Sequence, residues 1–163
     1  MISVAPLIFA ALTGSSANPT VPTVNPIVER VDIELSQCIK EQDNKGEAQY
    51  PCIYAGAMAC LGGPASNEER AECVSLERYF WDRKLNRLYK TMTSKKSPSS
   101  FSKDLRDAQR NWISLRDKDC SLFASMGVQG SREKRLHEEC MLEHTAFRYI
   151  KLDEFYQASK GRK

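Results

Sequence analysis

The sequence predicts an all-α fold: a small helical bundle of about five helices, three of them long, stapled by three disulfides. Apolar residues recur at every third or fourth position through most of the chain, as on the buried face of a helix. No segment of useful length shows the strict alternation of a β-strand. At 163 residues the chain has the length of one domain, and a hydrophobic content of 41% is enough for a modest core.

The first segment, residues 1–17, has the pattern of a secretory signal peptide. An uncharged apolar stretch from Ile2 to Leu12 is followed by small residues, with Ser15 and Ala17 at the spacing that signal peptidase accepts. This stretch of about 11 residues is shorter than the ~20 needed to span a bilayer, and no later segment is long enough. The sequence therefore predicts no membrane span and a periplasmic or secreted location.

A proline-rich linker, residues 18–25, precedes a single helical domain predicted over residues 26–160. Asn25 and Pro26 form a favourable pair of N-cap and first helical residue, so the first helix is expected over residues 26–42. The sequence DNKGE follows and ends this helix.

Two further helices are separated by a glycine-rich break. A short helix is expected over residues 51–61, and it ends at Gly62-Gly63-Pro64. Ser66 and Glu69 then form a capping box that opens a long helix running to about residue 94. The core stripe of this long helix is predicted from a spacing of four, three and four residues: Trp81, Leu85, Leu88 and Met92.

The last two helices are expected to form a hairpin after the break at SKKSPSS. One is predicted over residues 101–126 and ends at Gly127, and the other begins with Ser131 as its cap and runs to about residue 158. The core stripe of the first of these helices is predicted from a spacing of three, four and three residues: Leu105, Ala108, Trp112 and Leu115.

Six cysteines behind a signal peptide predict an oxidising compartment and three disulfides. Cys52 and Cys60, if both lie on the short helix, are about 12 Å apart, beyond the ~7 Å limit between bridged Cα atoms. That pair is therefore excluded. Hairpin geometry favours three other pairs: Cys120 with Cys140, Cys60 with Cys73, and Cys38 with Cys52.

The charge distribution and the spacing of metal-ligand residues argue against the binding of nucleic acid, a metal ion or a cofactor. The net charge of +3 comes from 24 basic and 21 acidic residues, which are interleaved rather than gathered into a basic stripe. His137 and His144 are seven residues apart, about 10.5 Å along a helix, which is more than one metal ion can bridge. No CxxC pair is present. We therefore expect no nucleic-acid partner, no metal and no cofactor.

The sequence also argues against catalysis. If all six cysteines are oxidised, no thiolate remains as a nucleophile. No nucleophile elbow places a serine beside either histidine, and no pair of glycosidase carboxylates stands out among the 21 acidic residues. The sequence therefore predicts that the protein is not an enzyme.

A polar cluster lies within the helix predicted over residues 101–126, in the segment QRNWISLRDKDC, residues 109–120. At about 100° per residue, Gln109, Trp112 and Arg116 share a sector of roughly 80° with the apolar core residue Leu105. These polar groups therefore point inward, where each needs a hydrogen-bonding partner.

The preceding long helix offers partners for this cluster. Asp82 and Tyr89 lie on one side of that helix with Asn86 beside them, so we expect Arg116 to bond to Asp82 and Asn86. Two interpretations are open: a polar binding pocket, or an interhelical hydrogen-bond network that fixes the register of the helices. We favour the network because inward polar groups on facing helices more often hold the two helices together than bind a ligand.

Four segments resemble the LprI-type lysozyme inhibitor family: WDRKLNRLY, LRDAQRNWISLRDKDC, Gly130-Ser131 and CMLEHTAFR. The resemblance covers roughly residues 73–152. It implies a helical, non-catalytic bacterial protein, secreted or periplasmic, in a family whose named member inhibits lysozyme. With Arg148 from the last segment, the expected structural network comprises Asp82, Asn86, Tyr89, Gln109, Trp112, Arg116 and Arg148.

Two functional hypotheses follow. The first is an inhibitor that binds a lysozyme or another peptidoglycan-cleaving enzyme; the second is a periplasmic, envelope-associated interaction protein with no lysozyme target. Animal c-type lysozymes are strongly basic, and their inhibitors gain from acidic surfaces, whereas this chain is net basic. Glu68-Glu69 and Glu138-Glu139 are the local acidic stretches from which a complementary patch is expected.

Overall fold

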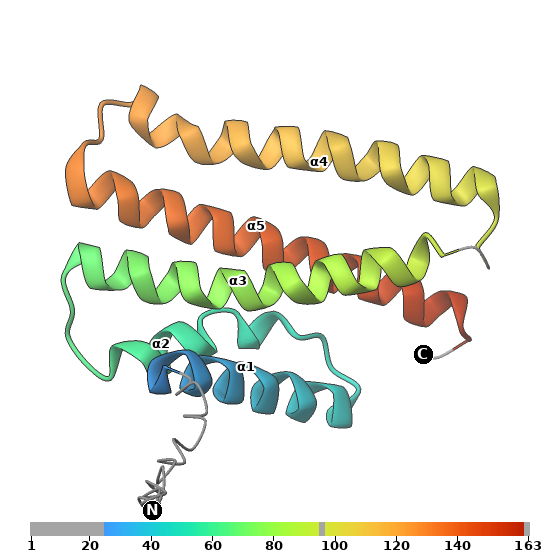
Figure 1. Ribbon diagram of the computed structural model, residues 1–163, viewed down its shortest axis with the longest axis horizontal. Coiled ribbons are helices and arrows are strands. Elements are labelled where there is room, and N and C mark those ends of the chain that lie inside the picture. The colour runs from blue at the N-terminus through green and yellow to red at the C-terminus, as the bar shows by residue number, and fades with distance from the viewer. Residues whose placement is uncertain (1–24, 95–96, 162–163) are drawn as a thin grey trace, which may run out of the picture.

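The computed structural model describes residues 25–94 and 97–161, which contain five α-helices, one short 3-10 helix and no strand (Figure 1). The predicted all-α class with three long helices is confirmed. The expected signal peptide lies outside the described residues, as does the expected linker except for Asn25. The elements in chain order are α1 (Pro26–Lys45), η1 (Tyr50–Cys52), α2 (Ala55–Leu61), α3 (Asn67–Met92), α4 (Ser99–Ser125) and α5 (Gly130–Ser159).

The predicted helix over residues 51–61 is wrong in its first half. The structure instead has η1, a break at Ile53 and Tyr54, and then α2. Tyr54 adopts a left-handed backbone conformation with φ of 79°, so one helix cannot run through this position. Cys52 consequently lies on η1 rather than on the helix that carries Cys60.

Helix α5 lies between α4 and α3, and α1 and α2 cover the other side of α3 (Figure 1). The most extensive helix contact is between α3 and α5, which run side by side for most of their length. Helix α4 packs mainly on α5. Because it has one main neighbour, its 27 residues include just three that are buried: Ser102, Leu105 and Cys120.

The core has two parts. The larger part joins α1, α2, α3 and α5 around Trp81, which is fully buried. The smaller part joins α3, α4 and α5 near the α3–α4 connection and consists of Leu85, Met92, Leu105 and Leu152. The predicted stripe of α4 is wrong at Ala108 and Leu115, which are exposed because α5 covers a narrower face of α4 than the periodicity suggested.

Three disulfides tie neighbouring elements together, and they are the three expected pairs. Cys38–Cys52 joins α1 to η1, Cys60–Cys73 joins α2 to α3, and Cys120–Cys140 joins α4 to α5. Their Cα atoms are 5.6, 5.7 and 5.5 Å apart, respectively, within the usual range for bridged cysteines. All six cysteines are paired.

The carboxylate of Glu77 joins α2 to α3 from inside the core. Its Oε1 accepts hydrogen bonds from the amide of Tyr54 at 2.8 Å and from the indole of Trp81 at 2.9 Å, while Oε2 accepts from the amide of Ala57 at 2.7 Å. Its side chain is completely buried, and burial raises the pKa of Glu77 although these donors oppose the effect. The carboxylate thus supplies acceptors for the first turn of α2.

Gly56 allows α2 to pack closely against α1. A Cβ atom at this position would lie 2.7 Å from Cγ1 of Val31 and 2.9 Å from the carbonyl oxygen of the same residue. Because one of these neighbours is backbone, a larger residue would push α2 away from α1.

No helix within the described residues has an apolar stretch long enough to cross a membrane.

We expect Glu77→Ala to lower the free energy of unfolding by about 3 to 5 kcal/mol, because it leaves two buried donors and one part-buried donor without an acceptor. Urea unfolding of the oxidised protein measures this loss. Glu77→Gln keeps one acceptor oxygen and should lose less. Glu72→Ala, at an exposed position of the same helix, is the control and should change stability by about 0.5 kcal/mol or less. A loss in Glu77→Ala no larger than in this control would contradict the proposed role of Glu77.

Candidate functional site

The α4–α5 interface brings together four residues of the expected polar network. Arg148 of α5 donates from Nε to Oε1 of Gln109 at 2.9 Å. The guanidinium carbons of Arg116 and Arg148 lie 4.9 and 5.8 Å from the ring centroid of Trp112. Two cations therefore lie against one indole ring, an arrangement that fixes α4 on α5.

Arg148 is the most constrained member of this cluster. Burial lowers the pKa of its guanidinium, and its Nη2 atom is buried without a hydrogen-bonding partner among the described residues. A cation in this position holds Gln109 and Trp112 in place. We therefore propose that the cluster is a structural clasp between α4 and α5.

The expected partners on α3 are arranged differently. Asn86 donates to Asp82 at 2.7 Å within α3, whereas Arg116 pairs with its neighbour Asp117 at 2.8 Å. Tyr89 and Trp112 both pack against the smaller core cluster. The expected bond from Arg116 to Asp82 and Asn86 is thus wrong, because α5 lies between α4 and α3 over most of their length.

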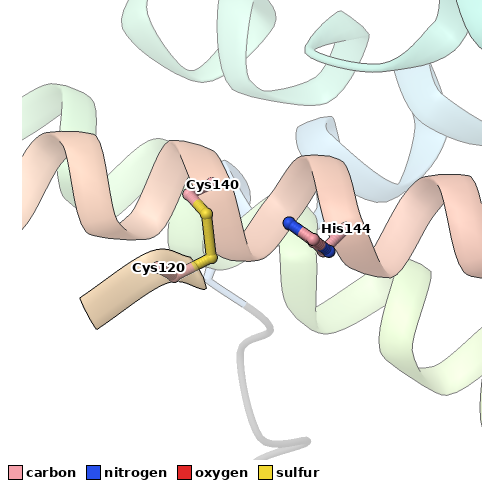
Figure 2. A group of neighbouring side chains, drawn as sticks. All are labelled: Cys120, Cys140 and His144. Atoms are coloured by element: carbon pink, nitrogen blue, oxygen red, sulfur yellow. A yellow bond between two sulfur atoms is a disulfide. The ribbon is translucent and has the colours of Figure 1, made fainter. Parts of the chain in front are cut away.

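The disulfide Cys120–Cys140 lies beside His144 (Figure 2). Within residues 25–94 and 97–161, these three residues are the one group of ligand types close enough to hold a metal, with ligand atoms within 4.8 Å of one another. Both sulfur atoms are bonded to each other, so neither is a thiolate that could bind a metal. In the oxidised protein the imidazole of His144 is the one ordinary metal ligand of this group.

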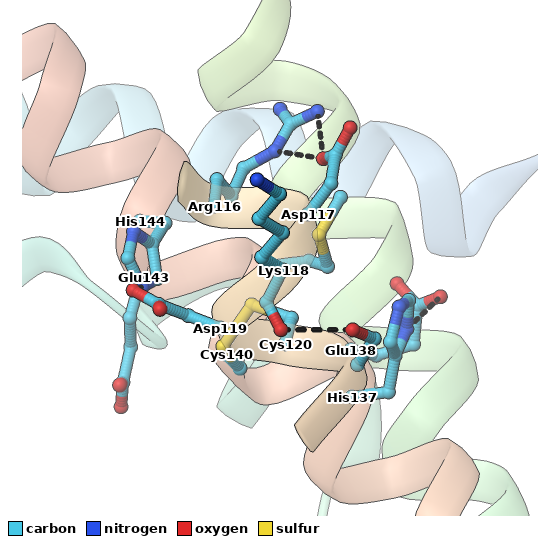
Figure 3. Close-up of a disulfide and its surroundings, with 12 residues drawn as sticks. Arg116, Asp117, Lys118, Asp119, Cys120, His137, Glu138, Cys140, Glu143 and His144 are labelled. Atoms are coloured by element: carbon cyan, nitrogen blue, oxygen red, sulfur yellow. Dashed lines mark hydrogen bonds and ion pairs between the residues drawn. A yellow bond between two sulfur atoms is a disulfide. The ribbon is translucent and has the colours of Figure 1, made fainter. Parts of the chain in front are cut away.

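Charged side chains surround this disulfide (Figure 3). Nε2 of His144 lies 3.5 Å from Oδ2 of Asp119, and Nδ1 of His137 lies 3.7 Å from Oε1 of Glu138. Each histidine thus has a carboxylate neighbour, but neither pair includes a serine or a free thiol to activate. The arrangement accounts for local ion pairing rather than for nucleophilic chemistry.

Three of the four acidic residues expected to form a patch have basic or backbone partners instead. Glu138 pairs with Arg78 of α3 at 3.0 Å, and Glu139 pairs with Arg135 at 2.6 Å. Glu69 accepts from the backbone amide of Ser66 as the second half of the capping box. These carboxylates therefore stabilise helices and their packing, and most of their charge is compensated locally.

A different set of carboxylates forms an acidic cleft between the C-terminal ends of α1 and α5. The cleft has a volume of about 980 Å³, and its acidic lining residues are Asp43, Glu47, Asp153 and Glu154. No lysine or arginine is among the described residues that line it. No local sequence pattern predicts this cleft, because its acids come from two segments about a hundred residues apart.

Hydrogen bonds hold the carboxylates of the acidic cleft in place. Gln49 donates to Asp43 at 2.7 Å and Gln157 donates to Asp153 at 3.2 Å. Burial raises the pKa of Asp153, and the nearby carboxylates add to this effect. Burial and the same negative surroundings raise the pKa of Tyr149 to about 12. Glu154 is paired with Lys151 at 2.6 Å, so the negative character of the cleft comes from Asp43, Glu47 and Asp153. These three carboxylates make the cleft suited to positively charged groups.

Comparison with known proteins gives one match. The family model described as lysozyme inhibitor LprI matches residues 60–152, from the end of α2 to the last third of α5. The matched segment contains all seven residues of the expected polar network and four of the six cysteines. No curated protein and no solved structure matches the chain.

We expect Arg148→Ala to lower the free energy of unfolding by about 1 to 3 kcal/mol, because it removes the hydrogen bond to Gln109 and uncovers Trp112. Its effect should be non-additive with Gln109→Ala. Arg110→Ala, at a position on α4 whose side chain is 78% exposed, is the control and should be close to neutral. A stable Arg148→Ala variant that no longer binds a target would instead make this cluster a binding site.

Replacing Cys120 and Cys140 together with alanine should cost about 3 kcal/mol, since the bridge closes a loop of 20 residues. Because α4 has one main packing partner, its amides should then exchange hydrogen faster than those of α3. Replacing Cys38 and Cys52 is the matched control, and it should accelerate exchange in α1 but not in α4. Equal acceleration in all helices would contradict a local role for the bridge.

Proposed function

Because the chain belongs to the lysozyme inhibitor LprI family, we propose that it is a periplasmic or secreted protein that binds and inhibits a lysozyme or another peptidoglycan-cleaving enzyme. The observation that carries this proposal is the family match, which spans more than half of the chain and most of α3, α4 and α5. The protein inhibits its target enzyme by binding to it and does not itself catalyse a reaction.

The chemistry of the described residues supports a non-catalytic role. All six cysteines are in disulfides, so none is available as a thiolate nucleophile. The three disulfides also support a location outside the reducing cytosol, because such bridges persist in oxidising compartments.

The acidic cleft supports a basic target in spite of the net charge of +3. Long-range attraction depends on the local potential that a partner meets, and carboxylates gathered around one cleft concentrate that potential. Asp43, Glu47 and Asp153 supply such a surface at one end of the molecule. A strongly basic c-type lysozyme fits this surface better than an acidic enzyme does.

We expect the purified mature protein to slow the clearing of bacterial cell walls by at least one enzyme in a panel of c-type, g-type and bacterial lytic enzymes. Turbidity assays measure inhibition, and pull-down with the same panel measures binding. Absence of both across the panel would reject the proposal and favour an envelope-associated protein without a lysozyme target.

For a basic target, Asp43→Asn combined with Asp153→Asn should slow association and weaken its dependence on salt concentration. Glu68→Gln, at an exposed position in the first turn of α3 that does not line the cleft, is the charge control for one of the two substitutions. Equal association rates for the cleft variant and the control would show that the target binds elsewhere.

A further inference from the structure

Helix α4 carries an exposed apolar stripe on a side that α5 does not cover. The stripe consists of Phe101, Ala108, Leu115 and Leu122, which follow one another at intervals of seven residues. Phe101, Leu115 and Leu122 are 42%, 55% and 54% exposed. Seven residues fall about 20° short of two full helical turns, so the stripe drifts by about 60° from end to end and stays on one side of α4.

The residues that hold α4 on α5 lie elsewhere on the helix. Leu105 belongs to the smaller core cluster, Gln109 bonds to Arg148, and Cys120 forms the disulfide. The stripe therefore contributes little to the fold of one chain. Its three large apolar side chains are exposed along one side of α4, which makes this side a candidate contact surface for a partner.

A polar row runs beside the stripe on the solvent side. Asp104, Asn111 and Lys118 each follow a stripe residue by three positions, and all three are exposed. Neither Asp104 nor Lys118 forms an ion pair with another described residue. The row thus has one negative charge near its start, one positive charge near its end and an amide midway.

The apolar stripe and the polar row of α4 are complementary to the same stripe and row on a second copy of the chain in antiparallel orientation. With a two-fold axis between residues 111 and 112, Phe101 lies at the level of Leu122 of the second copy, and small Ala108 lies at the level of large Leu115. The same symmetry brings Asp104 within about one residue of the level of Lys118 of the second copy. Two opposite-charge pairs therefore form beside the apolar column.

A parallel pairing lacks this complementarity. It would put Asp104 at the level of Asp104 and Lys118 at the level of Lys118 of the second copy, so that no opposite-charge pair forms, and it would leave a gap where two alanines meet. Charge and side-chain size thus both select the antiparallel arrangement.

We propose that the protein forms a two-fold symmetric homodimer in which α4 packs antiparallel against α4 of a second copy through this stripe. The interface is isologous: each copy contributes the same apolar column and the same polar row. The pairing is independent of the proposed inhibition of a lysozyme, because its evidence lies within α4 alone.

Light scattering on the mature, oxidised chain over a range of concentrations tests the dimer. The expected result is twice the monomer mass at high concentration, and the monomer mass throughout for Leu115→Asp. Ile113→Asp is the matched control, because Ile113 is 40% exposed on the same helix but points about 160° away from Leu115, and it should remain dimeric. A monomeric wild-type protein, or equal disruption by both variants, would overturn the proposal.

A charge swap tests the antiparallel register. Lys118→Glu should weaken the dimer about tenfold, because it turns two opposite-charge pairs into like-charge pairs. Adding Asp104→Lys to the same chain should restore the affinity, since the pairs are then attractive again. If the double variant is as weak as Lys118→Glu, the antiparallel register is wrong.

A cross-link gives an independent readout of the same geometry. Asn111→Cys should form a disulfide-linked dimer under mild oxidation, because this position faces itself across the two-fold axis. Arg110→Cys, one position away and turned from the stripe, should not. A monomeric protein whose Leu115→Asp variant folds but loses inhibition would assign the stripe to the target enzyme and reject the dimer.

Discussion

The buried carboxylate of Glu77 is the interaction on which the N-terminal half of the protein depends. A helix of seven residues such as α2 is too short to be stable alone, so it needs partners for its first amides and a surface to pack on. Glu77 provides acceptors for Tyr54 and Ala57, and through Trp81 it links them to the centre of the core. The close approach at Gly56 and two disulfides then hold α1 and α2 against α3.

The C-terminal hairpin is stabilised in a different way. Helix α4 is attached to α5 by one disulfide, by the clasp around Trp112 and by a small core at one end. Because these contacts use one side of α4, the rest of its surface remains available to a partner. The α3–α5 pair acts as the scaffold, and α4 is the element most free to serve in association.

Local signals in the sequence predicted the long helices and the disulfides, because caps, glycine breaks and hairpin spacing act over a few residues. The capping box of Ser66 is present as expected. Periodicity predicts which side of α4 faces inward, but it does not predict how wide the buried face is. It therefore places Leu115 in the core, although this residue is exposed. The partners of Arg116 and the acceptor role of Glu77 depend on which helices become neighbours, and angles within one helix carry no such information.

The net charge of the sequence does not predict the charge of a local surface, because it does not show which side chains become neighbours. Glu138, one of two adjacent acids in the sequence, is compensated by Arg78, whereas Asp43 and Asp153 come together only in the folded chain. The acidic cleft is built from the ends of α1 and α5, and the apolar stripe is built from α4. Since no residue belongs to both, a dimer formed through α4 would carry two such clefts, and a target bound at one cleft would need no contact with the stripe.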